Sequence, residues 1–152
     1  MLTEVKYTGF PARVLQSLFP EIDHTQVPLY ADDTRAACSR FEFDRYWFRI
    51  VHPFSDFANM PVMVHEYAHM ATLVACGFGV MDRAPEYRLE AAAIFAEQAL
   101  AQRFPEYTRP VYERFNIQAT ADVRTLLANA MRATVAPTLL TAIKMVAEGR
   151  HG

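Results

Sequence analysis

The sequence predicts an α+β fold that is mostly helical, with a small antiparallel β-sheet ahead of its central helix. Aromatic and β-branched residues concentrate between positions 36 and 52, as is typical of strands. Residues 62–76 contain no helix breaker, an alanine-rich stretch follows Pro85, and the segment from Thr120 onward has helical periodicity. With 152 residues and 52% apolar content, the chain is expected to form one domain over residues 1–152.

The first 52 residues are expected to hold one short helix and one hairpin. Residues 12–19 predict a helix whose inward side chains are Val14, Leu15, Leu18 and Phe19, and a polar loop follows around residues 21–33. Residues 36–52 predict two strands with Asp44-Arg45 as the turn. No chemistry is evident in the first 35 residues.

The central helix is expected to span residues 60–76. Asn59 is a suitable N-cap, Pro61 is tolerated in the first turn, and Gly77 and Gly79 supply stop signals. Because this segment is apolar nearly all round, the helix should be buried.

Further helices are expected toward the C-terminus. Asp82-Arg83-Ala84-Pro85 would open a helix that is rich in alanine and carries Glu86, Glu90 and Glu97. After Thr120 the apolar positions indicate helical packing elements with a break near Pro137, the last one ending before Gly149.

The residues His65-Glu66-Tyr67-Ala68-His69 form an H-E-x-x-H motif on the predicted central helix. Side chains four apart lie on one helix face, so both imidazoles can bind one metal ion, for which Zn²⁺ is expected. Glu66 lies about 100° around the helix, where it would act as the general base that activates a zinc-bound water. The plainer interpretation is two core histidines that bond to backbone carbonyls.

A catalytic zinc ion needs a third protein ligand, and the alanine-rich helix supplies candidates. Glu90 and Glu97 are two turns apart on one face, and small neighbouring residues would let this helix approach the first. Glu86 or Glu97 could replace Glu90 as the ligand, and Glu86 with Glu90 could also be an exposed acidic stripe.

The stretch from residue 60 to 100 resembles the gluzincin group of zinc metallopeptidases. Glu90-Ala91-Ala92-Ala93-Ile94-Phe95-Ala96-Glu97 is similar in outline to a helix of thimet-type oligopeptidases and to one of the ImmA/IrrE family, both of which follow an H-E-x-x-H helix. The resemblance implies a zincin-like domain, Glu90 as the third ligand, and Glu97 as the residue that orients His65 or His69. It also implies that an edge strand before the metal helix offers its backbone to the substrate, which would place an added strand at residues 48–52, although these residues could equally be an aromatic core face.

These observations predict a zinc-dependent metallopeptidase acting on a peptide or a specific protein. The catalytic residues would be Glu66 and, as oxyanion donor, Tyr112, with Tyr107, Arg109 and His52 as alternatives. A non-catalytic metal-binding or protein-interaction module with a zincin-like fold is the alternative.

Charge and hydropathy limit the partners and the cellular location that we expect. A net charge of −2 without a basic block gives no reason to expect a nucleic-acid partner. Residues 1–6 lack a signal-peptide core and no apolar run reaches ~20 residues, so we expect a cytoplasmic protein without a membrane span. Export by another route, action in another cell, and the oligomeric state stay open.

Overall fold

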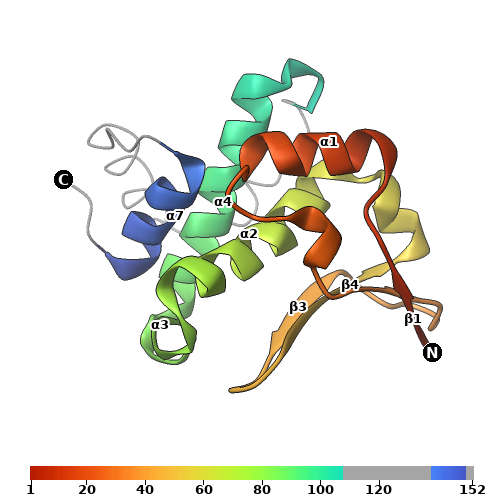
Figure 1. The fold of residues 1–152 in the computed structure, drawn as a ribbon, viewed down its shortest axis with the longest axis horizontal. Coiled ribbons are helices and arrows are strands. Elements are labelled where there is room, and N and C mark those ends of the chain that lie inside the picture. Colours follow the sequence, from red (N-terminus) through yellow and green to blue (C-terminus); the bar gives the residue numbers. More distant parts are fainter. Residues whose placement is uncertain (108–137, 150–152) are drawn as a thin grey trace.

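A layer of helices packs against one face of a four-stranded sheet in the computed structural model of this chain (Figure 1). The structure describes residues 1–107 and 138–149. Its strands are β1 (Leu2–Val5), β2 (Leu29–Asp32), β3 (Arg40–Phe43) and β4 (Phe48–Pro53), and its helices are α1 (Gly9–Leu18), α2 (Met60–Cys76), α3 (Phe78–Arg83), α4 (Glu86–Arg103) and α7 (Leu139–Glu148), with short 3₁₀ turns between them. The α+β class is therefore confirmed.

The sheet is mixed, which corrects the expected antiparallel sheet. Its strand order is β1-β2-β4-β3, with β1–β2 and β3–β4 antiparallel and β2–β4 parallel. Two of these strands come from the N-terminal segment where a helix and a loop were expected. Each has four residues, too few for alternation to show, and a parallel pairing has no local turn to announce it.

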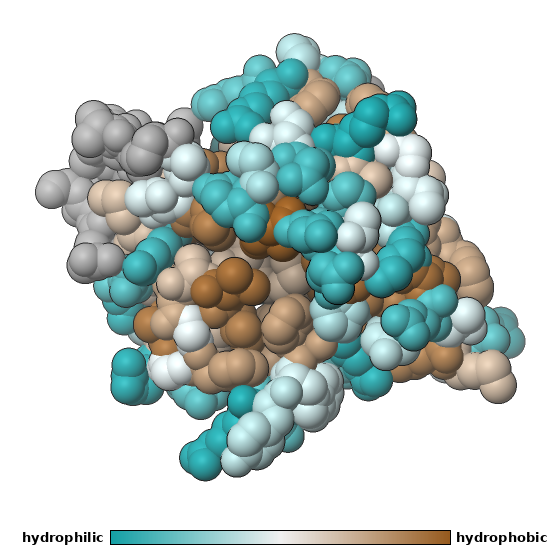
Figure 2. All heavy atoms as spheres, viewed as in Figure 1, coloured by the Kyte–Doolittle hydropathy of each residue, from teal (hydrophilic) through white to brown (hydrophobic). Residues whose placement is uncertain are grey.

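The predicted hairpin forms, but its outer strand is the first one. Asp44 N–H donates to Trp47 O over 2.8 Å where the turn was expected, and the hairpin projects below the body of the molecule (Figure 2). β4 lies between β2 and β3, so residues 48–52 already pair on both sides. The expectation that a substrate strand adds there is wrong. β3 is the edge strand instead.

The predicted helices in the described residues are present with small shifts of their ends. The inward residues of α1 are all at most 1% exposed, and α2 has the predicted bounds, with the Asn59 side chain accepting from Val62 N–H at 3.4 Å. Gly77 ends α2 with a φ of 84°, a conformation that favours glycine. α7 covers the last predicted helix, whereas residues 120–137 lie outside the described residues.

One helix was not expected. α3 lies between the stop signal at Gly77 and the expected start of the next helix, so Asp82 and Arg83 end α3 instead of opening α4, which begins at Glu86. Gly77, with its positive φ, changes the direction of the chain within one residue. Gly79 is therefore not needed to end α2, and it lies inside the short helix α3. No helix among residues 1–107 and 138–149 is long and apolar enough to cross a bilayer.

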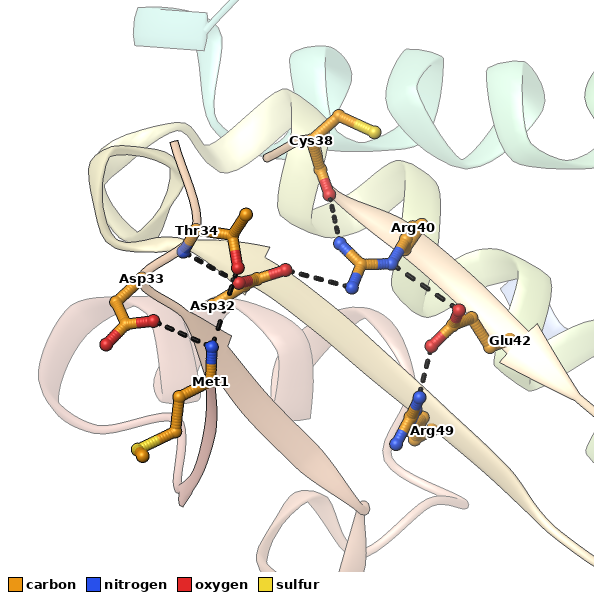
Figure 3. A network of polar contacts seen from close by, with 8 residues as sticks. All are labelled: Met1, Asp32, Asp33, Thr34, Cys38, Arg40, Glu42 and Arg49. Atoms are coloured by element: carbon orange, nitrogen blue, oxygen red, sulfur yellow. Dashed lines mark hydrogen bonds and ion pairs between the residues drawn. The ribbon is translucent and has the colours of Figure 1, made fainter. Parts of the chain in front are cut away.

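Charged side chains fix the register of β3 on the solvent face of the sheet (Figure 3). Arg40 contacts Asp32 on β2 at 2.9 Å, and Glu42 accepts from Arg49 on β4 at 2.7 Å. Because side chains alternate along a strand, Phe41 and Phe43 must then face the helices. A slip by one residue would exchange the two faces and bury charge.

A buried chain of hydrogen bonds holds the other face of the sheet at the start of β3. His52, which is 0% exposed, bonds through Nε2 to the Tyr7 hydroxyl at 2.9 Å and through Nδ1 to Ser39 Oγ at 2.7 Å. Ser39 donates to Asp56 Oδ2 at 2.6 Å. Since Ser39 has one proton, it must accept from Nδ1–H, and Tyr7 must donate to Nε2. His52 is thus neutral in this arrangement, and a proton on Nε2 would require the Tyr7 hydroxyl to turn and accept instead of donating.

Acid should therefore weaken the fold through His52. Burial lowers the pKa of His52 from 6.5 to about 4, although the charge of Asp56 opposes the shift. Between these values the unfolded chain binds a proton that the folded chain excludes, so the free energy of unfolding falls as the pH drops, at about 1.4 kcal/mol per unit and roughly 3 kcal/mol in total. We expect urea denaturation of metal-free protein to show this loss, and to show much less of it in His52→Asn.

His24→Asn is the matched control, because His24 is a half-buried histidine that lies outside this hydrogen-bond chain. It should keep the acid sensitivity of the unmodified protein. Equal losses of stability in His52→Asn and the unmodified protein between pH 6.5 and 4 would refute the role of His52.

Candidate metal centre

The structure brings His65, His69 and Glu90 together between α2 and α4. His65 Nε2 lies 3.0 Å from Glu90 Oε2, and His69 Nε2 lies 3.1 Å from Glu90 Oε1. One ligand atom from each residue lies within 4.8 Å of the other two. Tetrahedral zinc with bonds of about 2.1 Å holds its ligand atoms about 3.4 Å apart. The three donors are therefore close enough to share one ion after small side-chain adjustments.

Helix geometry and small side chains explain why these groups meet. The imidazoles of His65 and His69 come from successive turns of α2, and their ring centroids are 4.9 Å apart. On α4 the residues between the two glutamates are largely alanines that are at most 1% exposed: Ala91, Ala92, Ala93 and Ala96. Alanine lets the helix axes approach closely, so a carboxylate on α4 reaches the histidine face of α2.

Glu97 orients the His65 ring through Nδ1, the ring nitrogen on the side away from Glu90. Its carboxylate is 1% exposed and lies 2.8 Å from His65 Nδ1. A carboxylate accepts only, so Nδ1 carries the proton and the lone pair of Nε2 is directed at the cluster when the imidazole is neutral. Partners of this kind raise the basicity of a metal-binding histidine. Neither of the two other candidate ligands takes the place of Glu90. Glu97 lies on the opposite side of the His65 ring, and Glu86 lies outside the three-residue cluster.

The cluster attracts positive charge. Burial lowers the pKa of His65, but hydrogen bonds and charge from Glu90 and Glu97 outweigh it and raise this pKa to about 9. Burial would raise the pKa of Glu90, yet the two histidines hold it well below its usual range. Without a metal, the site thus keeps a proton on His65 beside ionised carboxylate. A divalent cation would replace that proton.

Among the described residues, the cluster is most exposed on the side of Glu90. The side chains of His65 and His69 are 6% and 12% exposed, whereas that of Glu90 is 38% exposed. A hollow of about 240 Å³ reaches His69 and Glu90 there, with Phe41, Phe43, Met81 and Leu89 in its walls. Three ligands with an open fourth side are the arrangement of catalytic zinc sites, since structural sites close all four positions.

Glu66 is half-buried and follows His65 directly on α2. Burial raises the pKa of the Tyr7 hydroxyl, and the nearby charges of Tyr67 and Glu66 add to this effect. Tyr7 therefore lies within electrostatic reach of Glu66, a proximity that no sequence pattern indicated because the two residues are far apart along the chain.

The oxyanion donor stays a prediction. Tyr112 and Arg109 lie outside the described residues. Tyr107 follows the far end of α4, roughly 20 Å along the helix axis from Glu90. Both ring nitrogens of His52 already bond to hydroxyls, so this histidine is not a suitable donor.

Two aromatic residues near the site were assigned only to a strand by the sequence. Phe41 and Phe43 line the hollow from β3. The alternation in Arg40-Phe41-Glu42-Phe43 is the signal that would have placed them on one face. Met81 carried no such signal because it lies on α3, which was not expected, and Leu89 lies on the expected α4 but was not singled out.

Comparison with protein-family models, curated proteins and solved structures gives no match for this chain. The residues of the site themselves therefore carry the functional interpretation.

If Glu97 orients His65 for metal binding, its replacement should change the affinity of the site for zinc. Glu97→Gln keeps the shape of the side chain but removes its charge, and we expect zinc to bind 10- to 100-fold more weakly, as is common for such partners. Competition with a chromogenic chelator at pH 7.5 measures this.

Glu106→Gln is the control, since Glu106 is an exposed glutamate in the 3₁₀ turn after α4. Its zinc affinity should equal that of the unmodified protein. If the zinc affinity of Glu97→Gln is also unchanged, the contact between Glu97 and His65 does not influence metal binding.

Proposed function

We propose that this protein is a zinc-dependent peptidase with a zincin-like fold, in which His65, His69 and Glu90 hold the metal. The proposal rests on one observation above all, the convergence of these three donors beside a partly open hollow, with Glu66 next in sequence to the first ligand. The substrate would be a peptide or an exposed segment of a protein. A cytoplasmic location remains a prediction from the sequence.

The donor set suits zinc better than the common hard cations. Two imidazole nitrogens and one carboxylate are typical zinc ligands, whereas magnesium and calcium prefer sites built from oxygen. The raised pKa of His65, caused by the hydrogen bonds and charges of Glu90 and Glu97, supports a site that favours positive charge. When bound, zinc would polarise the scissile carbonyl and make an attacking water more acidic.

The protein's own groups would then move the protons. Glu66 accepts a proton from the attacking water as the new C–O bond forms, and it returns this proton to the amine nitrogen as the C–N bond breaks. Glu97 holds the His65 ring in place through Nδ1. Atoms balance without any further reactant, since one water is consumed for each peptide bond.

A purely structural metal site is the less favoured alternative. Structural zinc closes its fourth position with a further protein ligand, commonly cysteine. Within residues 1–107 and 138–149, the only group of metal-binding side chains consists of His65, His69 and Glu90. The adjoining hollow also has no role in a structural site.

Glu66→Gln separates hydrolysis from metal binding. The variant should bind one zinc as before, because Glu66 is not a ligand, and should lose about 10²- to 10⁴-fold in cleavage rate because the amide cannot take up the proton. Zinc content is measured by elemental analysis, and cleavage is measured by mass spectrometry of a proteome-derived peptide mixture.

Glu106→Gln again serves as the matched control and should cleave like the unmodified protein. If the unmodified protein binds zinc and cleaves nothing, the non-catalytic alternative holds. If Glu66→Gln cleaves at the same rate as the unmodified protein, Glu66 is not the base.

A further inference from the structure

A second hollow lies between the end of α3, the first turn of α4 and the end of α7 (Figure 1). It measures about 270 Å³, and its lining consists of three charged residues, Arg83, Arg88 and Glu148, and three apolar ones, Val80, Ala84 and Ala147. We call it the arginine hollow. It is distinct from the hollow beside the metal-binding cluster, because the two have no described lining residue in common.

The two arginines of this hollow are unpaired in the part of the chain that the structure describes. Neither the guanidinium of Arg83 nor that of Arg88 forms a hydrogen bond or an ion pair with residues 1–107 or 138–149. Arg88 is half-buried, and its Nε–H is buried without an acceptor. A buried donor without a partner is costly, and more so on a charged group. An oxyanion in the hollow would give these cations the acceptors that they lack.

Two glycines let the arginine side chains lie close to the backbone. A Cβ at Gly79 would lie 3.3 Å from Arg83 Nη2, so Arg83 folds back over its own helix. A Cβ at Gly149 would clash with Arg88 Nη1, so Arg88 lies against the C-terminal turn of α7. The partial negative charge of a helix C-terminus favours a cation there. This explains the position of Arg88, but it leaves the hydrogen-bond donors of Arg88 unused.

We propose that the arginine hollow binds a phosphate group, either as free phosphate or as a small phosphate monoester. A guanidinium fork binds two oxygens at a time, so two forks on one ligand need more than the two oxygens of a carboxylate. A phosphate monoester offers three acceptor oxygens, and its charge approaches −2 at neutral pH. Arg83 and Arg88 line the same hollow, so one phosphate there can meet both charges. This inference does not depend on the proposed peptidase function.

The rest of the lining limits what the phosphate can carry. An apolar cavity of ~150 Å³ holds a benzene ring, so about 270 Å³ has room for a phosphate with a small organic body. Val80, Ala84 and Ala147 offer that body an apolar surface. Glu148 adds one negative charge to the lining and would repel a second anionic group. The hollow therefore suits a ligand with a single phosphate.

Calorimetry on the full-length protein at pH 7.5 tests the proposal with three probes. Inorganic phosphate and phenyl phosphate represent the two sources of the group, and benzoate is the carboxylate that matches phenyl phosphate in its ring. We expect phenyl phosphate to bind with a Kd below ~1 mM, and benzoate to bind at least ~10-fold more weakly.

Substitutions assign the binding to the two arginines. Arg83→Gln and Arg88→Gln should each weaken the binding of phenyl phosphate at least ~10-fold, because each removes one charged fork. Arg88→Lys keeps the charge but not the fork, and should lose most of the affinity as well. Arg83 is exposed, so Arg83→Gln covers the case in which a change at Arg88 prevents folding.

Two further variants and a metal control complete the test. Arg13→Gln changes an exposed arginine of α1 that does not line the hollow, and should bind as the unmodified protein does. Glu148→Gln removes the opposing charge and should strengthen phosphate binding about threefold. Phosphate can also coordinate zinc, so each titration is run on metal-free and on zinc-loaded protein, and both should give the same affinity.

The outcomes decide between these possibilities. If both phosphate probes fail to bind at ~10 mM, or if their binding requires zinc or is unchanged in both arginine variants, the inference is wrong. Benzoate binding as tight as that of phenyl phosphate would also overturn it. Equal affinities for phosphate and phenyl phosphate would support it with free phosphate as the ligand, and tighter binding of phenyl phosphate would support it with a monoester. None of these results depends on whether the protein cleaves peptides.

Discussion

The contact between α2 and α4 is the interaction on which the site depends. A histidine on one helix and two glutamates on the other meet because buried alanines let the helices pack closely, and the His65–Glu97 bond of 2.8 Å lies within that packing. A larger residue at one of these alanines would move the helices apart and would withdraw both carboxylates from His65 together. The packing of α2 against α4 therefore also sets the positions of the proposed metal ligands, because α4 is both a wall of the core and the element that carries Glu90 and Glu97.

A second constraint acts on the strand that borders the site. β3 is held on its outer face by the Arg40–Asp32 and Glu42–Arg49 pairs and near its start by the Ser39–His52 hydrogen bond. An edge strand normally has few contacts that fix its register. The two ion pairs fix the register of β3 from the solvent face, and the Ser39–His52 hydrogen bond fixes it near the start of the strand. The inner face of β3 can therefore remain apolar beside the hollow. The Arg40–Asp32 pair is partly buried, with side chains 31% and 7% exposed, and together with the Glu42–Arg49 pair it specifies the register of β3.

The sequence predicted the features that local periodicity encodes. The bounds of α2 and the inward face of α1 follow from residues three and four apart, and the clustering of His65, His69 and Glu90 follows from helix geometry plus the space that alanines leave. What it missed depends on contacts between distant segments. β2 is a strand through its antiparallel pairing with β1 and its parallel pairing with β4, and the second pairing leaves β3 at the open edge. Tyr7, Ser39 and Asp56 likewise acquire their roles from one buried histidine that is distant from Tyr7 in sequence.

The electrostatics of the metal-free cluster connect folding to the proposed chemistry. Glu97 and Glu90 place two carboxylates against one imidazole, so a protonated His65 leaves the group with one unit of negative charge in a largely buried setting. Burying net charge is costly unless it is compensated. If a divalent ion bound while His65 and His69 were neutral, its two positive charges would cancel the two carboxylates, and the net charge of the group would be zero. If the proposed site binds a divalent ion, the same residues would also stabilise the folded state, because the ion would offset the negative charge that Glu90 and Glu97 place in the metal-free cluster.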